Sequence, residues 1–302
     1  MGGLGLGIGG SPEAARLVSV LTSQAVAHNI LGMSRTIAQI RNRDGFPKAG
    51  ELIEFRSQQE LSLQDRRILN LLIEHAGPNI VTESEHRIPM TALRGRHKGN
   101  ERVRDSILCL MTAVVEIPVK DNNERQATQR GQFLADTTAT DDEDDPNGEV
   151  RYSFSKTMRK VIAESQYWGR LKAYVICSFQ SKYALALYEA LCLRGNLQIR
   201  EQELGVADFR LLLGIPEGKL ELFKNLKKWA IDLAVEEVNA LSDFWVEIDP
   251  VREGGARGKL KGFHLSWRRK SKEEWQTCLD ELMRPKVGRK ARIKGVVERL
   301  AV

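Results

Sequence analysis

The chain contains 302 residues, 42% of them hydrophobic, and carries a net charge of +6. This length predicts about two domains with apolar cores, and the basic excess is compatible with a polyanionic partner such as nucleic acid. No run approaches the ~18 apolar residues of a membrane span, and the N-terminus has no signal-peptide pattern. The four cysteines form no C-x-x-C pair, so we expect reduced thiols in a cytoplasmic protein without a membrane partner.

Glycines dominate the first ten residues, MGGLGLGIGG. A dinucleotide-binding glycine loop follows a strand and opens a helix, and no strand precedes these glycines. We therefore predict a flexible glycine-rich tail and then a helix that begins near Ser11, with Pro12 at its first position. Together they make up residues 1–49.

Residues 50–172 are predicted to form a first unit of helices followed by strands. LSLQDRRILNLLIEHAG has the pattern of a helix, with Ser62 as N-cap and Asp65 in the capping-box position. RIPMTALRG is a short second helix, and NERVRDSILCLMTAVVEI is a third that becomes extended over residues 114–120. Candidate partner strands for this extended segment are Gln132–Leu134 and Val150–Phe154.

An acidic loop is predicted at residues 136–149. Its centre holds five consecutive acidic residues, 141–145, which raise the possibility of a metal site. Adjacent carboxylates repel one another, and the segment lacks the glycine and the ligand spacing of a calcium loop. A solvated loop without metal is the expectation.

Residues 173–270 repeat the same order of elements. SKYALALYEALCLRG is a helix with Ser181 as N-cap, LQI a short strand, QELGVADFRLLLGI a second helix and FKNLKKWAIDLAVEEVNAL a third. The strands 244–249 and 260–268 then flank the turn PVREGGARGK. Two helix-rich units of three helices and a β-hairpin predict an α+β fold with two tandem winged-helix domains, followed by a basic C-terminal tail, 271–302.

The third helix of the second unit carries its lysines at the front. At 100° per residue one arc holds four apolar residues, Phe223, Leu226, Ala230 and Leu233, and the lysines lie opposite them. Beyond Trp229 apolar residues occupy the side that the lysines held, so the front should project into water while the back is buried. This is the arrangement of a recognition helix, whose first turns enter the major groove. The candidate DNA-binding residues here are Lys224, Asn225, Lys227 and Lys228.

Two further basic segments belong to the predicted DNA surface. The hairpin turn would contact phosphates or the minor groove. The start of the third helix in the first unit is preceded by the cluster RGRHKGNERVR. The alternatives are a solvated helix face for the third helix of the second unit, a solubilising turn for the hairpin and a solvated loop for this cluster. The C-terminal RPKVGRKARIK would add non-specific affinity for DNA, with a disordered basic tail as the alternative. The candidates are Arg252, Arg257, Lys259 and Lys261 in the wing, and Lys98, Asn100, Arg102 and Arg104 in the first unit.

Catalytic patterns are absent from the sequence. The five histidines lack metal-ligand spacing, and there is no Walker A motif, no G-x-S-x-G and no H-x-H pair. Tyr183 and Tyr188 lie on a helix with a core pattern, which argues against a tyrosine nucleophile for DNA nicking. We expect no enzyme activity, no catalytic residues, no metal and no cofactor.

Three motifs follow one another in the second unit: Ser-x-Tyr-Ala-x-x-Leu-Tyr-Glu at 181–189, Arg-x-x-Leu-Gly at 210–214 and Ala-Val-x-Glu-Val-Asn at 234–239. With the wing GKLKGFHLSW, they resemble the iteron-binding plasmid replication initiators over roughly residues 51–270. Val238 stands where that family usually has isoleucine, and the acidic insertion enlarges the first unit.

The resemblance implies a function in plasmid replication. It implies binding to the iterons of an origin, opening of A·T-rich DNA, and recruitment of the host initiator DnaA and helicase DnaB in a bacterial cytoplasm. In this family the monomer usually initiates, while dimers repress their own gene or couple origins in copy number control. The second unit would read the bases, and the first would contact the neighbouring groove and supply the dimer surface. The alternative is a winged-helix repressor without initiator activity.

Overall fold

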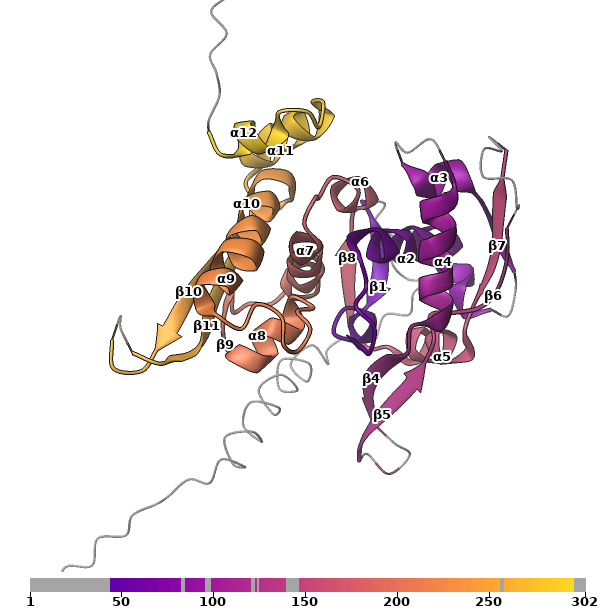
Figure 1. Cartoon of the computed structure of the whole chain (residues 1–302), viewed down its shortest axis with the longest axis horizontal. Coiled ribbons are helices and arrows are strands. Elements are labelled where there is room, and N and C mark those ends of the chain that lie inside the picture. The colour runs from indigo at the N-terminus through magenta and orange to yellow at the C-terminus, as the bar shows by residue number, and fades with distance from the viewer. Residues whose placement is uncertain are drawn as a thin grey trace, which may run out of the picture. The chain divides into compact units, whose positions relative to one another are not determined.

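The computed structural model describes residues 44–82, 85–95, 99–120, 123, 125–139, 147–255 and 258–295 (Figure 1). All of them belong to one compact body, Arg41–Val302, which contains both of the units predicted from the sequence. Most of the predicted segment 1–49 lies outside these residues, as do the acidic run 141–145 and the last part of the basic tail. No helix within the described ranges is long and apolar enough to cross a membrane.

The first unit contains the expected helices α2 (Leu63–Ala76), α3 (Met90–Arg94) and α4 (Glu101–Thr112). The Ser62 hydroxyl accepts a hydrogen bond from the Asp65 N–H, and the Asp65 carboxylate accepts one from the Ser62 N–H, so the predicted capping box is confirmed. A 3₁₀ turn, η3 (Gly77–Val81), follows α2 directly. Ile68 and Leu72 are completely buried on the inner face of α2.

The strands of the first unit form two sheets. Strand β4 (Val115–Lys120) pairs with β2 (Arg56–Ser57) and β5 (Gln126–Gly131), and β7 (Glu149–Phe154) pairs with β3 (His86–Pro89) and β6 (Leu134–Ala139). The two predicted partners of residues 114–120 are therefore wrong. The longer of the two actual partners, β5 with the sequence QATQRG, is mostly polar because it is an outer strand of its sheet, so it lacks the apolar pattern by which a strand is recognised.

A short sheet and short helices connect the two units. Strand β1 (Phe46–Ala49), followed by the 3₁₀ turn η2 (Gly50–Leu52), pairs antiparallel with β8 (Trp168–Leu171). Helix α5 (Lys156–Glu164) precedes β8, and α6 (Ala173–Ile176) follows it. This pairing joins segments that are about 120 residues apart, which sequence periodicity alone did not indicate.

The second unit starts with α7 (Lys182–Arg194), whose N-cap hydroxyl, Ser181, accepts hydrogen bonds from the Tyr183 and Ala184 N–H groups as predicted. The predicted strand LQI is wrong: the strand is β9 (Glu201–Gly205), and α8 (Val206–Leu212) starts only after it. Glutamates favour a helix over 201–205, but pairing of β9 with β11 (Leu260–Arg269) decides the conformation.

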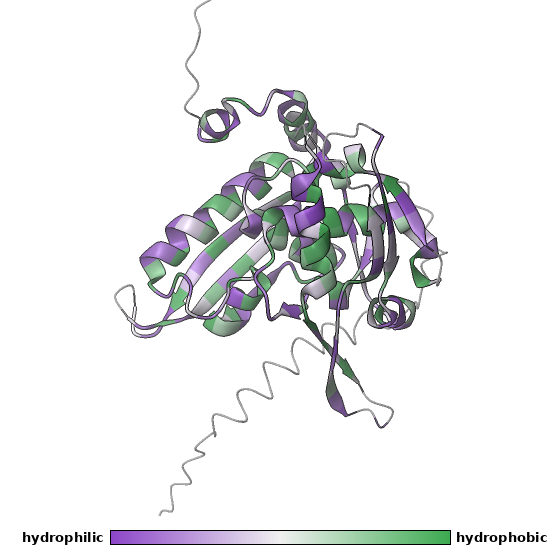
Figure 2. Cartoon of the chain, turned by 45° about the vertical axis from the view of Figure 1, so that its right-hand side comes forward, coloured by the Kyte–Doolittle hydropathy of each residue, from purple (hydrophilic) through white to green (hydrophobic). Residues whose placement is uncertain are grey.

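The third helix of this unit runs through α9 (Phe223–Leu226), a π-helical turn η4 (Lys227–Ile231) and α10 (Asp232–Leu241). It leads into β10 (Phe244–Arg252), which pairs with β11 in a sheet of order β10-β11-β9. The alternation along the two strands predicts that Phe244, Val246, Ile248, Phe263, Leu265 and Trp267 face inward. All of them are buried except Ile248, which is half-buried. Figure 2 shows hydrophobic and hydrophilic residues alternating along these two strands.

The C-terminal segment continues the fold over residues predicted as a basic tail. Helix α11 (Lys272–Met283) starts with a capping box between Ser271 and Glu274, and α12 (Arg289–Ile293) follows it. The Arg289 guanidinium is buried and donates hydrogen bonds to the carbonyls of Glu281, Leu282, Arg284 and Ser178. This arginine caps the end of α11 and ties it to the segment after α6.

A buried ionic cluster joins the two units. Lys48 Nζ lies 2.8 Å from Glu189 Oε1, and the Asn70 amide donates to the same oxygen at 2.7 Å. Arg66 Nη2 lies 3.3 Å from Glu189 Oε2. Burial alone would raise the pKa of Glu189, but Lys48, Arg66 and Asn70 hold the pKa below its ordinary value. Glu189 is therefore a charged link between β1, α2 and α7.

We predict that Lys48→Met lowers the free energy of unfolding by about 3 kcal/mol, because it removes one partner of a buried ion pair. The matched control is Lys182→Met, which removes a partly exposed ion pair with Glu60 and should cost under about 1 kcal/mol. Urea unfolding followed by circular dichroism measures both. An equal loss of stability in the two variants would contradict the conclusion that the buried Lys48–Glu189 ion pair stabilises the fold.

Candidate nucleic-acid interface

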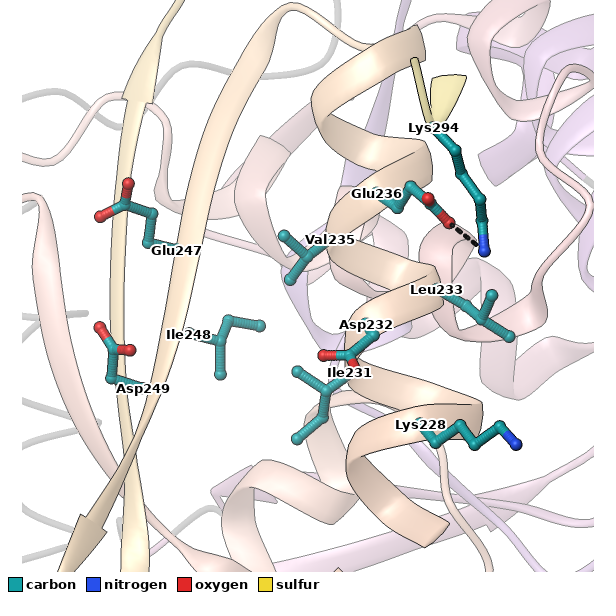
Figure 3. Close-up of a pocket in the computed structure, with 10 residues that line it drawn as sticks. All are labelled: Lys228, Ile231, Asp232, Leu233, Val235, Glu236, Glu247, Ile248, Asp249 and Lys294. Carbon is teal, nitrogen blue, oxygen red and sulfur yellow. Dashed lines mark ion pairs between the residues drawn. The ribbon is translucent and has the colours of Figure 1, made fainter. Parts of the chain in front are cut away.

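The third helix of the second unit changes its phase in the π-helical turn. Leu226 and Ile231 are both buried although they are five residues apart, and the Asp232 N–H donates to the Lys227 carbonyl as in a π-helix. The projection at 100° per residue correctly places Ala230 inside, but Leu233, predicted on the same arc, is only half-buried, and Ile231, predicted on the side of the lysines, is buried. The extra residue turns Ile231 into the core, and Figure 3 shows Ile231 and Lys228 on opposite sides of the helix.

The candidate residues at the front of this helix all lie on its exposed surface. Lys224, Asn225, Lys227 and Lys228 are exposed, whereas Leu226 and Ala230 are buried. Lys227 forms an ion pair with Asp232, also on the surface, and Lys228 Nζ lies 4.6 Å from the centre of the Trp229 ring. The helix thus presents cations and an amide to solvent, as predicted from its sequence, and these groups suit phosphate oxygens and base edges.

Arg210 holds the turn that precedes this helix. Its guanidinium donates to the carbonyls of Pro216, Lys219 and Leu220, which lie between α8 and α9. Leu220 has a φ of 51°, and no other non-glycine residue in the described part of the chain has a positive φ. This conformation is unfavourable for leucine, so the hydrogen bonds from Arg210 stabilise it. Arg210 belongs to the Arg-x-x-Leu-Gly motif, but the motif alone did not predict this contact.

Two residues of the Ala-Val-x-Glu-Val-Asn motif fix the back of the helix. The Asn239 side chain accepts from the Val246 N–H at 2.8 Å and donates to the Val246 carbonyl at 2.9 Å. The Glu237 carboxylate accepts from the N–H groups of Gln180 and Ser181, and burial raises its pKa. Asn239 therefore joins the helix to the wing, and Glu237 joins it to the start of α7.

The candidate residues of the wing differ in their exposure to solvent. Lys259 and Lys261 are exposed, and Arg257 lies outside the described residues. The Arg252 guanidinium is half-buried: it donates to the Gly258 carbonyl and lies 4.7 Å from the centre of the Phe223 ring. Arg252, at the end of β10, thus joins the turn of the wing to Phe223, the first residue of α9. This contact places the basic turn of the wing next to the basic start of the third helix.

The first unit presents only some of the predicted contact residues on its surface. Arg102 is exposed and Arg104 half-buried, while Lys98 lies outside the described residues. Asn100 is completely buried, so its side chain is not on the surface where we predicted it. Its carbonyl accepts from the Val103 and Arg104 N–H groups, which shows that Asn100 starts α4 rather than facing solvent.

A groove between α10 and β10 borders the basic surface. In Figure 3, Ile231, Val235 and Ile248 point into the groove, and Glu247 and Asp249 extend from the far side of the strand. Lys294 lies 3.8 Å from Glu236 on the opposite side of the helix. The groove is therefore lined by side chains of both charges, Lys228 and Lys294 among them, and it adjoins the exposed lysines at the front of the helix.

Metal binding and a tyrosine nucleophile are the two catalytic features to compare with the structure. The described residues contain no group of three His, Cys, Asp or Glu side chains placed to hold a metal ion. Tyr188 is fully buried, its hydroxyl accepts a hydrogen bond from the Lys172 N–H, and burial raises its pKa well above the ordinary value. It is therefore part of the core and inaccessible to a DNA phosphate, as its helical pattern predicted.

Comparison with protein-family models gives two matches. Residues 47–192 match the family described as "Initiator Replication protein, WH1", and residues 205–267 match "Initiator Rep protein, WH2". Together they cover more than two thirds of the chain and confirm the two tandem winged-helix domains that the sequence predicted. A comparison with curated proteins gave no match.

We predict that Asn239→Ala lowers the free energy of unfolding by about 1–3 kcal/mol, because the N–H and carbonyl of Val246 lose their side-chain partner. Asn225→Ala serves as the control, since that asparagine is exposed on the same helix and its loss should change stability by less than about 0.5 kcal/mol. Thermal and urea unfolding would measure both. Equal stability of Asn239→Ala and the parent protein would disprove the structural role of Asn239.

Proposed function

The chain belongs to the initiator replication protein family of DNA-binding plasmid replication initiators, and we propose that it binds the iterons of its origin. The observation that carries this proposal is the exposed basic front of the third helix, α9 and η4, which is held in place from behind by Asn239 and Glu237. A helix that is anchored in the core and exposed at its start can enter the major groove without losing its packing.

The second winged helix would supply the sequence-specific contacts. Lys224, Lys227 and Lys228 would neutralise phosphates or bind guanine edges, and Asn225 suits an adenine edge. Because Arg252 packs the wing against the start of α9, Lys259 and Lys261 would reach the backbone beside the same groove. Arg257 would join them at the tip of the wing.

The first winged helix would contact the neighbouring part of the duplex. Arg102 and Arg104, at the start of α4, and Lys98, which precedes it, are the residues proposed for phosphate contacts. Two winged helices on one duplex fit a repeat of about two helical turns, that is ~17–22 bp. This unit would also supply the surface through which the protein dimerises.

After binding, the protein would promote opening of the adjacent A·T-rich DNA and recruit the host initiator DnaA and the helicase DnaB. The monomer would initiate, and dimers would repress the protein's own gene or couple origins. We propose that it works in the bacterial cytoplasm at its plasmid and the nucleoid, without catalytic activity, metal or cofactor. Binding requires none, because phosphate neutralisation supplies affinity and base-edge contacts supply specificity.

A plasmid test distinguishes initiation from repression. A plasmid whose only replication functions are this gene and its flanking repeats should be maintained in a suitable host. If the protein binds the repeats tightly but the plasmid is lost, the protein is a winged-helix repressor. Nicked circles after incubation of supercoiled origin DNA with protein and divalent metal would instead identify a nicking enzyme.

We predict that the double variant Lys227→Ala/Lys228→Ala binds origin DNA more than ~10-fold more weakly, with an unchanged circular dichroism spectrum. Both side chains are exposed, so their loss should remove contacts with DNA and leave the fold intact. Fluorescence anisotropy with a labelled origin duplex measures the affinity. The slope of log K against log salt should also become shallower, because fewer counterions are released.

The matched control is Lys156→Ala/Lys160→Ala, which removes two exposed lysines from α5, outside the proposed DNA surface. It changes the net charge by the same amount, and we expect an affinity within about 3-fold of the parent from the long-range field alone. Equal weakening in both double variants would show that total charge, and not the front of the third helix, governs binding.

A further inference from the structure

Trp229 lies within the basic surface of the third helix, with 52% of its side chain exposed. Its neighbours along the chain, Lys227 and Lys228, are exposed too, and Ala230 is buried. Indole is a large apolar group whose burial is favourable, and tryptophan side chains are highly buried on average. An exposed tryptophan among the residues proposed to meet DNA therefore needs a physical explanation.

The π-helical turn accounts for its position. Leu226 and Ile231 are the buried residues on either side of the turn, and the longer turn leaves Lys227, Lys228 and Trp229 together on the outside. The widened turn therefore keeps the indole in the exposed row with the lysines while Ile231 remains in the core.

The ring is also held beside a cation. Lys228 Nζ lies 4.6 Å from the centre of the indole ring, close enough for a cation–π interaction that orients both groups. The surface thus combines one apolar face with an adjacent positive charge. A DNA major groove offers a matching pair of groups: the thymine 5-methyl, which is the apolar group on the base edges there, and the phosphates that border it.

We propose that Trp229 is a specificity-determining residue that packs against a thymine methyl in the origin repeat. This inference rests on the proposed DNA binding and deepens it, because it assigns a base feature to a residue outside the charged set. Lys228 holds the indole and neutralises a neighbouring phosphate. The apolar contact then favours thymine over cytosine at one position, since cytosine lacks the methyl group.

The test compares origin duplexes that contain thymine with duplexes in which deoxyuridine replaces it, a change that removes only the methyl group. The parent protein should bind the deoxyuridine duplex about fourfold more weakly, the effect of burying one methyl-sized group. Trp229→Ala should bind the thymine duplex more weakly than the parent does, and should bind the two duplexes equally.

Trp245→Ala is the control, because Trp245 is 39% exposed on β10 and lies outside the third helix. This variant should keep the fourfold preference for thymine. If Trp229→Ala also keeps the preference, or if it binds as tightly as the parent, the inference is wrong. If the parent itself fails to bind the repeats, the proposed function fails first.

Discussion

Glu189 is a fully buried carboxylate, and an unpaired charge in that position would cost several kilocalories per mole. Its partners come from two other elements, Lys48 on β1 and Arg66 with Asn70 on α2. Helix α7 is therefore held against β1 and α2 by buried charges. Glu237 on the third helix also accepts a hydrogen bond from the Ser181 N–H at the start of α7. The position of the basic surface therefore depends on how this cluster holds α7.

Two motif residues, Arg210 and Asn239, and the wing residue Arg252 fix the elements around that surface. Arg210 holds the turn before the third helix, Asn239 joins the helix to the wing, and Arg252 joins the wing to the start of the helix. None of these contacts requires DNA, so this support is organised in advance. A rigid support of this kind reduces the conformational entropy that is lost on binding. Affinity and specificity then depend on the exposed lysines, Asn225 and Trp229.

Several features were predictable because they depend on nearby residues. The capping box at Ser62 and Asp65 spans four residues, and the inward alternation of Phe244 and Val246 follows from the period of a strand. Predictions failed where a distant partner decides the conformation. Residues 201–205 form a strand because β11 lies beside them, and QATQRG is a strand although it is polar. Asparagine is a residue type that commonly contacts DNA, but packing around the start of α4 buries Asn100.

The sequence by itself determined the three main helices of each winged-helix unit, the hairpin of β10 and β11, the family motifs and the concentration of lysines at the front of the third helix, since periodicity and composition are local properties. Only the tertiary structure decided which of those residues face solvent. The π-helical turn between Leu226 and Ile231 is the clearest case. The wider turn brings Ile231 to the buried side of the helix, opposite Lys228, while Leu226 also stays buried. That is why a uniform helical projection put Ile231 on the side of the lysines, and why the position of Trp229 became evident only in the fold.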